Sequence, residues 1–168
     1  MAFSPTLSQV VLVITACVLF YVALTDFKEF QIRNELILVL VGLFILHALL
    51  SGRWVSAHWN AGFAALMFGI MLFFYSRKAM GGGDVKILTV AFLWVGVGCA
   101  FPFAVLLAIF AALHVAAAKF GWAKVQEVDG RKRIPLAPSV AAAMILCFLL
   151  GCLQPVYRTS PCPYCLPW

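Results

Sequence analysis

Long stretches without a single charged residue dominate the sequence and limit what it can fold into. Four of them are Leu7–Leu24, Leu36–Gly52, Trp54–Ser76 and Ile134–Tyr157, and a fifth, Ile87–Ala118, is longer than the others. In a bilayer core only helices and closed barrels satisfy every backbone polar group, and a helix needs about 20 apolar residues to cross. Because 65% of the residues are hydrophobic and only 11% charged, the chain is predicted to be an all-α integral membrane protein.

The longest uncharged stretch exceeds what one crossing requires. It contains Gly96, Gly98 and Pro102, which are typical of a tight turn and predict that the stretch forms two spans. The sequence therefore predicts a polytopic bundle of about six transmembrane helices, with residues 1–155 as the membrane domain and 156–168 as an irregular tail. A cleaved signal peptide is disfavoured for the first span, because the leading segment MAFSPTLSQ has no Lys or Arg.

Basic residues are distributed unevenly among the segments that join the expected spans. Of the twelve Lys and Arg residues, all but Arg53 and Arg158 lie in or beside the segments after the first, third and fifth spans. Because such residues collect on the cytoplasmic side, these segments are predicted to be cytoplasmic and both termini periplasmic. Topology thus accounts for the net charge of +6. The expected surroundings are a lipid bilayer, and no nucleic-acid partner is expected.

Two of the six acidic residues border expected spans at matching places. Asp26 follows the first span in YVALTD, and Asp84 opens the fourth in GGGD. Two spans lie between them, so the chain returns to the same membrane face and both carboxyl groups are expected there, whatever the orientation. Ordinary structural roles are open as well: Asp84 as a helix N-cap, and Asp26 as an ion-pair partner of Lys28 or Arg33.

Two neighbouring carboxyl groups can supply both halves of acid–base catalysis. Close carboxylates share a proton, so one can activate water as a general base while the other protonates the carbonyl or the leaving amine. Gly81 and Gly83 have no Cβ, so a peptide backbone can approach Asp84 closely, and they can adopt positive φ where needed. The pattern indicates an acid pair that acts on an extended peptide, with no metal and no cofactor expected.

At these motifs the sequence resembles the type IV prepilin peptidases, a family of membrane aspartic proteases. The segment MGGGDVKIL (Met80–Leu88) fits the family's GxGD motif. The segment DFKEFQIRNEL (Asp26–Leu36) is similar to the one that follows the family's first helix, except that Arg33 replaces a proline. The segment RIPLAPSVAAA (Arg133–Ala143) resembles the proline motif that opens the last conserved helix. The resemblance covers most of the chain.

The resemblance implies a substrate, a location and a set of site residues. The substrate would be the leader of a type IV prepilin, cut at the cytoplasmic face of a bacterial inner membrane just before the hydrophobic stem. Asp26 and Asp84 correspond to the catalytic pair. The residues expected to bind substrate are Gly81, Gly83, Lys86, Asn34, Pro135 and Pro138.

The compact layout resembles the peptidases of tight-adherence (Flp-type) pilus systems. Larger members of the family carry a cytoplasmic insertion with two CxxC pairs and also methylate the new N-terminus. Here only residues 25–35 join the first two expected spans, so no methyltransferase activity is expected.

Other residues suggest alternative functions. Cys162 and Cys165 form CPYC, the spacing of a thiol-disulfide oxidoreductase, although no βαβ pattern surrounds it. A cation transporter would need acids near mid-membrane, and a non-catalytic pilus assembly partner is a further alternative. His47 and His114 fall within expected spans, where a histidine can relay protons or form a hydrogen bond that supports packing.

Overall fold

The computed structural model describes residues 5–29, 33–52, 54–78, 80–120, 126–128, 131–133 and 135–151. The elements in chain order are helices α1 (Pro5–Glu29), α2 (Asn34–Ser51), α3 (Trp54–Ser76) and α4 (Gly82–Lys119), strands β1 (Gln126–Val128) and β2 (Arg131–Arg133), and helix α5 (Ala137–Leu149).

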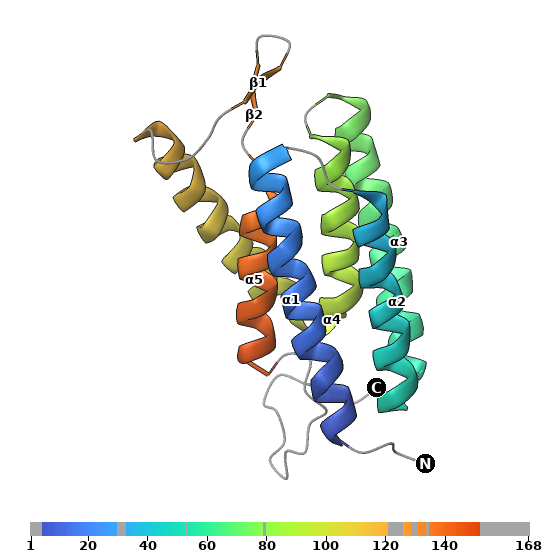
Figure 1. The fold of residues 1–168 in the computed structure, drawn as a ribbon. Helices are drawn as coiled ribbons and strands as arrows, with labels where there is room; N and C mark the ends of the chain where they lie inside the picture. The colour runs from blue at the N-terminus through green and yellow to red at the C-terminus, as the bar shows by residue number, and fades with distance from the viewer. Residues whose placement is uncertain are drawn as a thin grey trace.

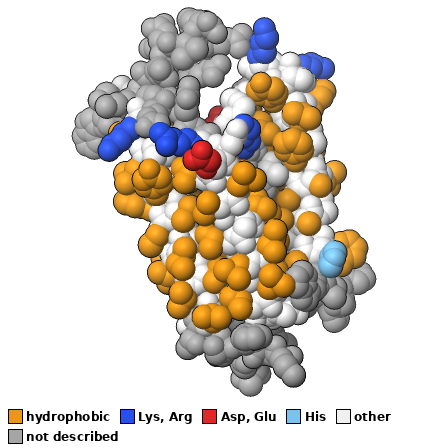
Figure 2. Space-filling model, turned by 45° about the vertical axis from the view of Figure 1, so that its right-hand side comes forward, with side chains coloured by type: hydrophobic (Ala, Val, Ile, Leu, Met, Phe, Trp, Pro, Cys, Tyr) orange, Lys and Arg blue, Asp and Glu red, His pale blue; other side chains and the backbone are white. Residues whose placement is uncertain are grey.

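Four helices, α1 to α4, are long and apolar enough to cross a membrane. Helix α5 has 13 residues and, at about 1.5 Å per residue, is shorter than the hydrocarbon core is thick. The chain is therefore a multi-pass membrane protein. On the face seen in Figure 2, hydrophobic side chains cover the body of the molecule, and charged side chains gather toward one end.

Helix α4 lies at the centre of the bundle. It packs against α2, α3 and α5, whereas α1 packs against α2 and α5 (Figure 1). The indole ring of Trp94 is fully buried, and its Nε1–H donates a hydrogen bond to the carbonyl oxygen of Leu40, 3.1 Å away. Phe44, His47 and Phe148 surround the same ring. Pairing this N–H with a carbonyl avoids the cost of an unsatisfied polar group in an apolar interior.

The expected division of Ile87–Ala118 into two spans is only partly confirmed. The 38 residues of α4 consist of two helical parts that meet at a kink, where Gly96 has the non-helical angles φ +66° and ψ −177°. Beyond Gly96 the yellow part of α4 turns back toward the end where α4 began (Figure 1). Pro102 lies inside the helix and does not end it. The described residues thus contain five helices, and the expected count of six is not confirmed.

The last expected span, Ile134–Tyr157, is longer than the helix that forms. Helix α5 begins only at Ala137, with a proline at its second position, where the missing N–H costs nothing. After Leu149 the chain reaches Gly151, whose φ of +79° is a left-handed conformation that helps to end the helix. Residues 152–157, like Cys162 and Cys165, lie outside the described residues.

A short antiparallel hairpin occupies the segment before α5. Gln126 pairs with Arg133, and Val128 with Arg131. Asp129 and Gly130, which join the two strands in the sequence, lie outside the described residues.

Candidate functional site

Three chain segments meet at one end of the bundle. Helix α1 ends there, and α4 and α5 both begin there (Figure 1). We call the last turn of α1 with the first turns of α4 and α5 the acid-bearing end. Helix α2 runs away from this end and α3 returns to it. The chain therefore brings Asp26 and Asp84 to one end of the bundle, as counting spans predicted.

Asp26 lies in the last turn of α1, three residues before its end at Glu29. Its side chain is only 5% exposed. The carboxylate oxygen Oδ2 accepts a hydrogen bond from the backbone N–H of Ala137, at an N···O distance of 3.1 Å. This hydrogen bond joins α1 to the start of α5, across 111 residues of sequence.

The N–H of Ala137 is available because of where α5 begins. Ala137 is the first residue of the helix, so its N–H has no carbonyl one turn earlier to bind. Leu136 at the N-cap makes no side-chain cap hydrogen bond, and Pro138 has no N–H at all. The carboxylate of Asp26 thus caps α5 from another helix, at the end where the helix dipole favours negative charge.

Asp84 is the third residue of α4, and it is half-buried. The N-cap is Gly81, so the possibility that Asp84 is the N-cap is wrong. The carboxylate folds back toward the N-cap: a Cβ built on Gly81 would lie 3.1 Å from Oδ2 of Asp84. That distance is shorter than a comfortable van der Waals contact, so the missing side chain leaves space for this carboxylate.

The glycines before Asp84 were expected for two reasons, close approach of a backbone and positive φ. The second reason is wrong. Gly81 is extended, with φ −74° and ψ 146°, and Gly82 and Gly83 are helical residues of α4. A Cβ on Gly82 would meet only the ring of Tyr75, 3.4 Å away. Close approach remains the explanation at Gly81, where the group that approaches belongs to Asp84 itself.

Two of the expected substrate-binding residues contact each other. The Nζ of Lys86, one turn into α4, donates a hydrogen bond to Oδ1 of Asn34, the first residue of α2, over 2.7 Å. Both side chains are exposed. The pair links α2 to α4 close to Asp84. This contact could not be predicted from the sequence, because 52 residues separate the two.

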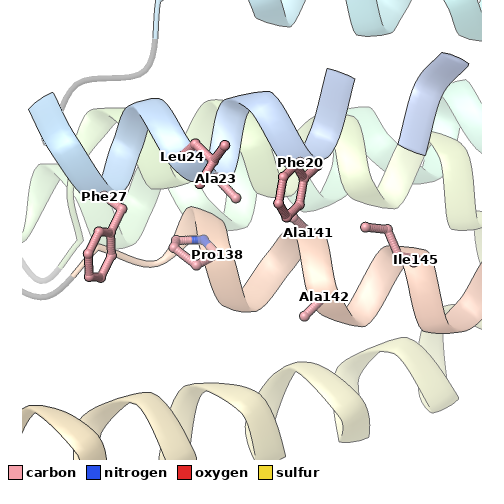
Figure 3. A pocket seen from close by; sticks show the side chains of 8 residues that line it. All are labelled: Phe20, Ala23, Leu24, Phe27, Pro138, Ala141, Ala142 and Ile145. Atoms are coloured by element: carbon pink, nitrogen blue, oxygen red, sulfur yellow. The ribbon is translucent and has the colours of Figure 1, made fainter. Parts of the chain in front are cut away.

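The two prolines lie next to the capped helix start. Pro135 is buried two residues before Ala137, and Pro138 follows Ala137. Pro138 also lines an apolar hollow of about 310 Å³ between α1 and α5. Phe27 and Pro138, which directly follow Asp26 and Ala137 in the sequence, line one end of the hollow. From there the hollow extends along both helices (Figure 3). Its walls include Phe20, Leu24 and Phe27 of α1 and Ala141 and Ile145 of α5.

Sequence reasoning missed the groups that surround Asp26. The N–H of Ala137 is a backbone group, and alanine carries no chemical signal of its own. Ser139 is buried, and its Oγ lies 3.3 Å from Nδ1 of His114 on the returning part of α4. The prolines beside Ala137 and the isolated His114 marked this region in the sequence, but nothing in the sequence linked them to Asp26.

The acid-bearing helices are held apart rather than packed together. Among the described residues, α1 makes no direct backbone approach to α4, and both pack against α2 and α5. Asp26 and Asp84 thus belong to separate helices that share two neighbours. Such an arrangement suits a pair of acids that act on a group lying between them.

Comparison with known proteins points to one family. The model of the type IV leader peptidase family matches residues 13–118, a range that includes both aspartates. A prepilin leader peptidase/N-methyltransferase of Bacillus subtilis (strain 168) is 31% identical over 148 residues, covering 83% of this chain and 55% of the relative. The chain therefore spans about half the length of that relative. No solved structure matches the chain.

Proposed function

Because this chain belongs to the type IV leader peptidase family, we propose that it is a membrane aspartic endopeptidase that removes the leader peptide of type IV prepilins. One observation carries the proposal. Within the range that matches the family, the last turn of α1 and the first turn of α4 each bring one aspartate to the same end of the bundle. A peptide bond that enters between these helices would meet both acids.

In the proposed reaction the two carboxyl groups divide the acid–base work. One carboxylate takes a proton from a water molecule as the water oxygen attacks the scissile carbonyl carbon. The carbon–nitrogen bond then breaks, and the other carboxyl group delivers a proton to the leaving amine. The hydrogen bond from Ala137 to Oδ2 of Asp26 holds that carboxyl group in place and uses only one of its two oxygens, which leaves the other for the reaction.

The remaining expected site residues bind the substrate on either side of the acids. Gly81 leaves room for the carboxyl group of Asp84, and Gly83 is the point where the substrate backbone passes. Lys86 and Asn34 provide exposed polar groups beside Asp84. The hollow next to Pro138 accepts an apolar part of the substrate. Pro135, buried two residues before Ala137, helps to place the start of α5 beside it. Apolar walls beside an acid pair suit a substrate that is cut where its apolar segment begins.

The proposal places the reaction at the cytoplasmic face of a bacterial inner membrane, on tight-adherence (Flp-type) prepilins. The basic residues near the acid-bearing end support this face. The proposal covers leader removal alone, without methyl transfer, because only residues 30–33 lie between α1 and α2. The methyltransferase activity in the relative's name belongs to that protein.

Co-expression with a tight-adherence prepilin tests the function directly. We expect the wild-type chain to convert the prepilin to its shorter mature form on a gel, and Asp26→Asn and Asp84→Asn each to abolish the conversion while still inserting. Glutamate at either position also fails, since the added methylene displaces the carboxyl group beyond what the reaction geometry tolerates. Glu35→Gln, which changes an exposed acid in the first turn of α2, serves as the matched control and retains cleavage.

The same experiment separates the alternatives. Full processing by either asparagine variant would contradict the aspartic mechanism. Loss of function in Cys162→Ser/Cys165→Ser, with both aspartates dispensable, would instead indicate a thiol-disulfide oxidoreductase. A wild-type chain that supports pilus assembly without cutting the prepilin would be a non-catalytic partner.

A further inference from the structure

Beside Asp26, a contact between two polar side chains joins α4 to α5, and the start of α5 in turn holds Asp26 of α1. Ser139 is the only hydroxyl residue of α5, and His114 is the only basic residue between Gly96 and Lys119 in α4. The two side chains nevertheless meet, with Nδ1 of His114 3.3 Å from Oγ of Ser139. Polar groups in a membrane-embedded region are costly unless they are paired, and an ionisable one there is a candidate for a functional role.

The contact falls on the helix turn that holds Asp26. Ser139 is the third residue of α5, and Ala137, which donates its N–H to Oδ2 of Asp26, is the first. Ser139 is only 4% exposed, so its contact with His114 lies inside the packed bundle. Asp26 and His114 are also near enough to interact electrostatically. The histidine therefore contacts the same turn of α5 that holds Asp26.

We propose that His114 is a positioning residue for Asp26, acting through Ser139 and the first turn of α5. The returning part of α4 contacts α5 at Ser139, and the start of α5 holds Asp26 through the Ala137 N–H. Together the two hydrogen bonds tie the carboxyl group to the returning part of α4, which follows, after the kink at Gly96, the part that carries Asp84 in its first turn. His114 thus helps to set the relative position of the two acids without touching the substrate. The inference depends on the proposed function only for the catalytic role of Asp26.

Substitutions at position 114 test this role through kinetics. His114→Leu removes the hydrogen bond, and we expect it to lower kcat for leader cleavage by about tenfold or more with little change in KM, because small displacements of a catalytic group are costly. His114→Asn places a polar atom near the position of Nδ1 and restores most of the rate. Ser139→Ala reproduces the loss, and the double variant is no worse than either single variant, as expected for one coupled interaction.

A histidine elsewhere in the bundle provides the matched control. His47 is buried in α2 against Trp94, so His47→Asn perturbs packing but leaves kcat within about twofold at equal amounts of folded protein. Unchanged kcat in His114→Leu, no recovery in His114→Asn, or additive losses in the double variant would each overturn the proposal.

A second measurement does not depend on peptidase activity. Dicyclohexylcarbodiimide reacts with carboxyl groups in apolar surroundings, and mass spectrometry can follow its addition to Asp26, with Asp26→Asn as the background. We expect several-fold faster labelling in His114→Leu than in the wild type or His47→Asn, because the carboxyl group is held less firmly. Equal rates would overturn the proposal. If the wild-type chain cut no prepilin, the proposed function would fail, while the labelling rates would still decide whether His114 holds Asp26.

Discussion

The carboxyl group of Asp26 accepts a hydrogen bond from a backbone N–H of another helix. The residues around that N–H therefore act mainly by positioning it. Sequence reasoning found both aspartates because acids are rare in this chain and because helix parity brings these two to one end. It could not find Ala137, since a backbone N–H becomes available only where a helix begins. Nor could it pair His114 with Ser139, because the contact depends on how α4 returns to α5.

The glycines before Asp84 are predicted to differ in their tolerance of alanine. A methyl group on Gly81 would lie 3.1 Å from Oδ2 of Asp84, so the carboxyl group must shift by a few tenths of an ångström. We expect Gly81→Ala to slow leader cleavage by about tenfold while the protein stays folded. Cleavage rates at matched membrane protein levels, together with thermal unfolding in detergent, measure the effect.

Gly82→Ala is the matched control for this prediction. Its methyl group would meet only the exposed ring of Tyr75 at 3.4 Å, and alanine in a helix is favoured over glycine by about 0.5–1 kcal/mol. Near wild-type cleavage with equal or greater stability is therefore expected. Gly83→Ala is expected to reduce cleavage if substrate backbone passes against it. Greater damage at Gly82 than at Gly81 would contradict the account of crowding around Asp84.

At the scale of elements, the break in α4 determines which residues lie near the acid-bearing end. Sequence signals at Gly96, Gly98 and Pro102 predicted a turn, but they could not rank the three positions. Gly96 is the break because it has positive φ and because its Cα lies directly against the side chain of Asn60 from α3. Pro102 is accommodated inside the helix. The choice depends on packing between helices, which local signals do not contain.

Gly96→Ala is predicted to destabilise the whole bundle. Alanine at positive φ costs roughly 1–2 kcal/mol, and the added methyl group would also collide with the side chain of Asn60. We expect a lower unfolding temperature in detergent and less protein in the membrane. The loss of cleavage should be no larger than the loss of folded protein, because Gly96 is remote from Asp84 along α4.

Gly98 offers a control two residues away. A Cβ there meets nothing within 4 Å, and its φ is not positive, so Gly98→Ala is expected to leave stability unchanged or slightly raised. Equal destabilisation by the two substitutions would mean that glycine is needed for general flexibility rather than for the conformation of Gly96.

For the whole molecule, composition and charge were sufficient to predict a helical membrane bundle with its basic residues on one side. The number of spans was harder to predict, because hydrophobicity does not show where an apolar helix ends. Helix α5 is shorter than its uncharged stretch, since Pro138 fixes its start and Gly151 lies just past its end. The short hairpin of β1 and β2 was also hard to predict, because a strand of three residues carries little sequence signal.

The arrangement of the helices makes a prediction about orientation. The hairpin lies beyond the acid-bearing end, whereas α5 runs from that end to the opposite one (Figure 1). A reporter inserted between Gln126 and Gly130 should therefore lie on the same side as Asp26 and Asp84, and a reporter fused after Trp168 on the other side. From the excess of Lys and Arg near the acid-bearing end, the first reporter is expected to be cytoplasmic and the second periplasmic.

Paired reporters that are active in only one compartment, such as alkaline phosphatase outside and a fluorescent protein inside, can distinguish these placements. A cytoplasmic signal at both positions would mean that α5, with 13 residues, does not carry the chain across. That outcome would leave the proposed site on the cytoplasmic face and change only the location of the tail. The reversed pattern, periplasmic at the hairpin and cytoplasmic after Trp168, would instead put both acids outside. A leader that stays in the cytoplasm could not reach them, and the proposed function would then be wrong even with both aspartates intact.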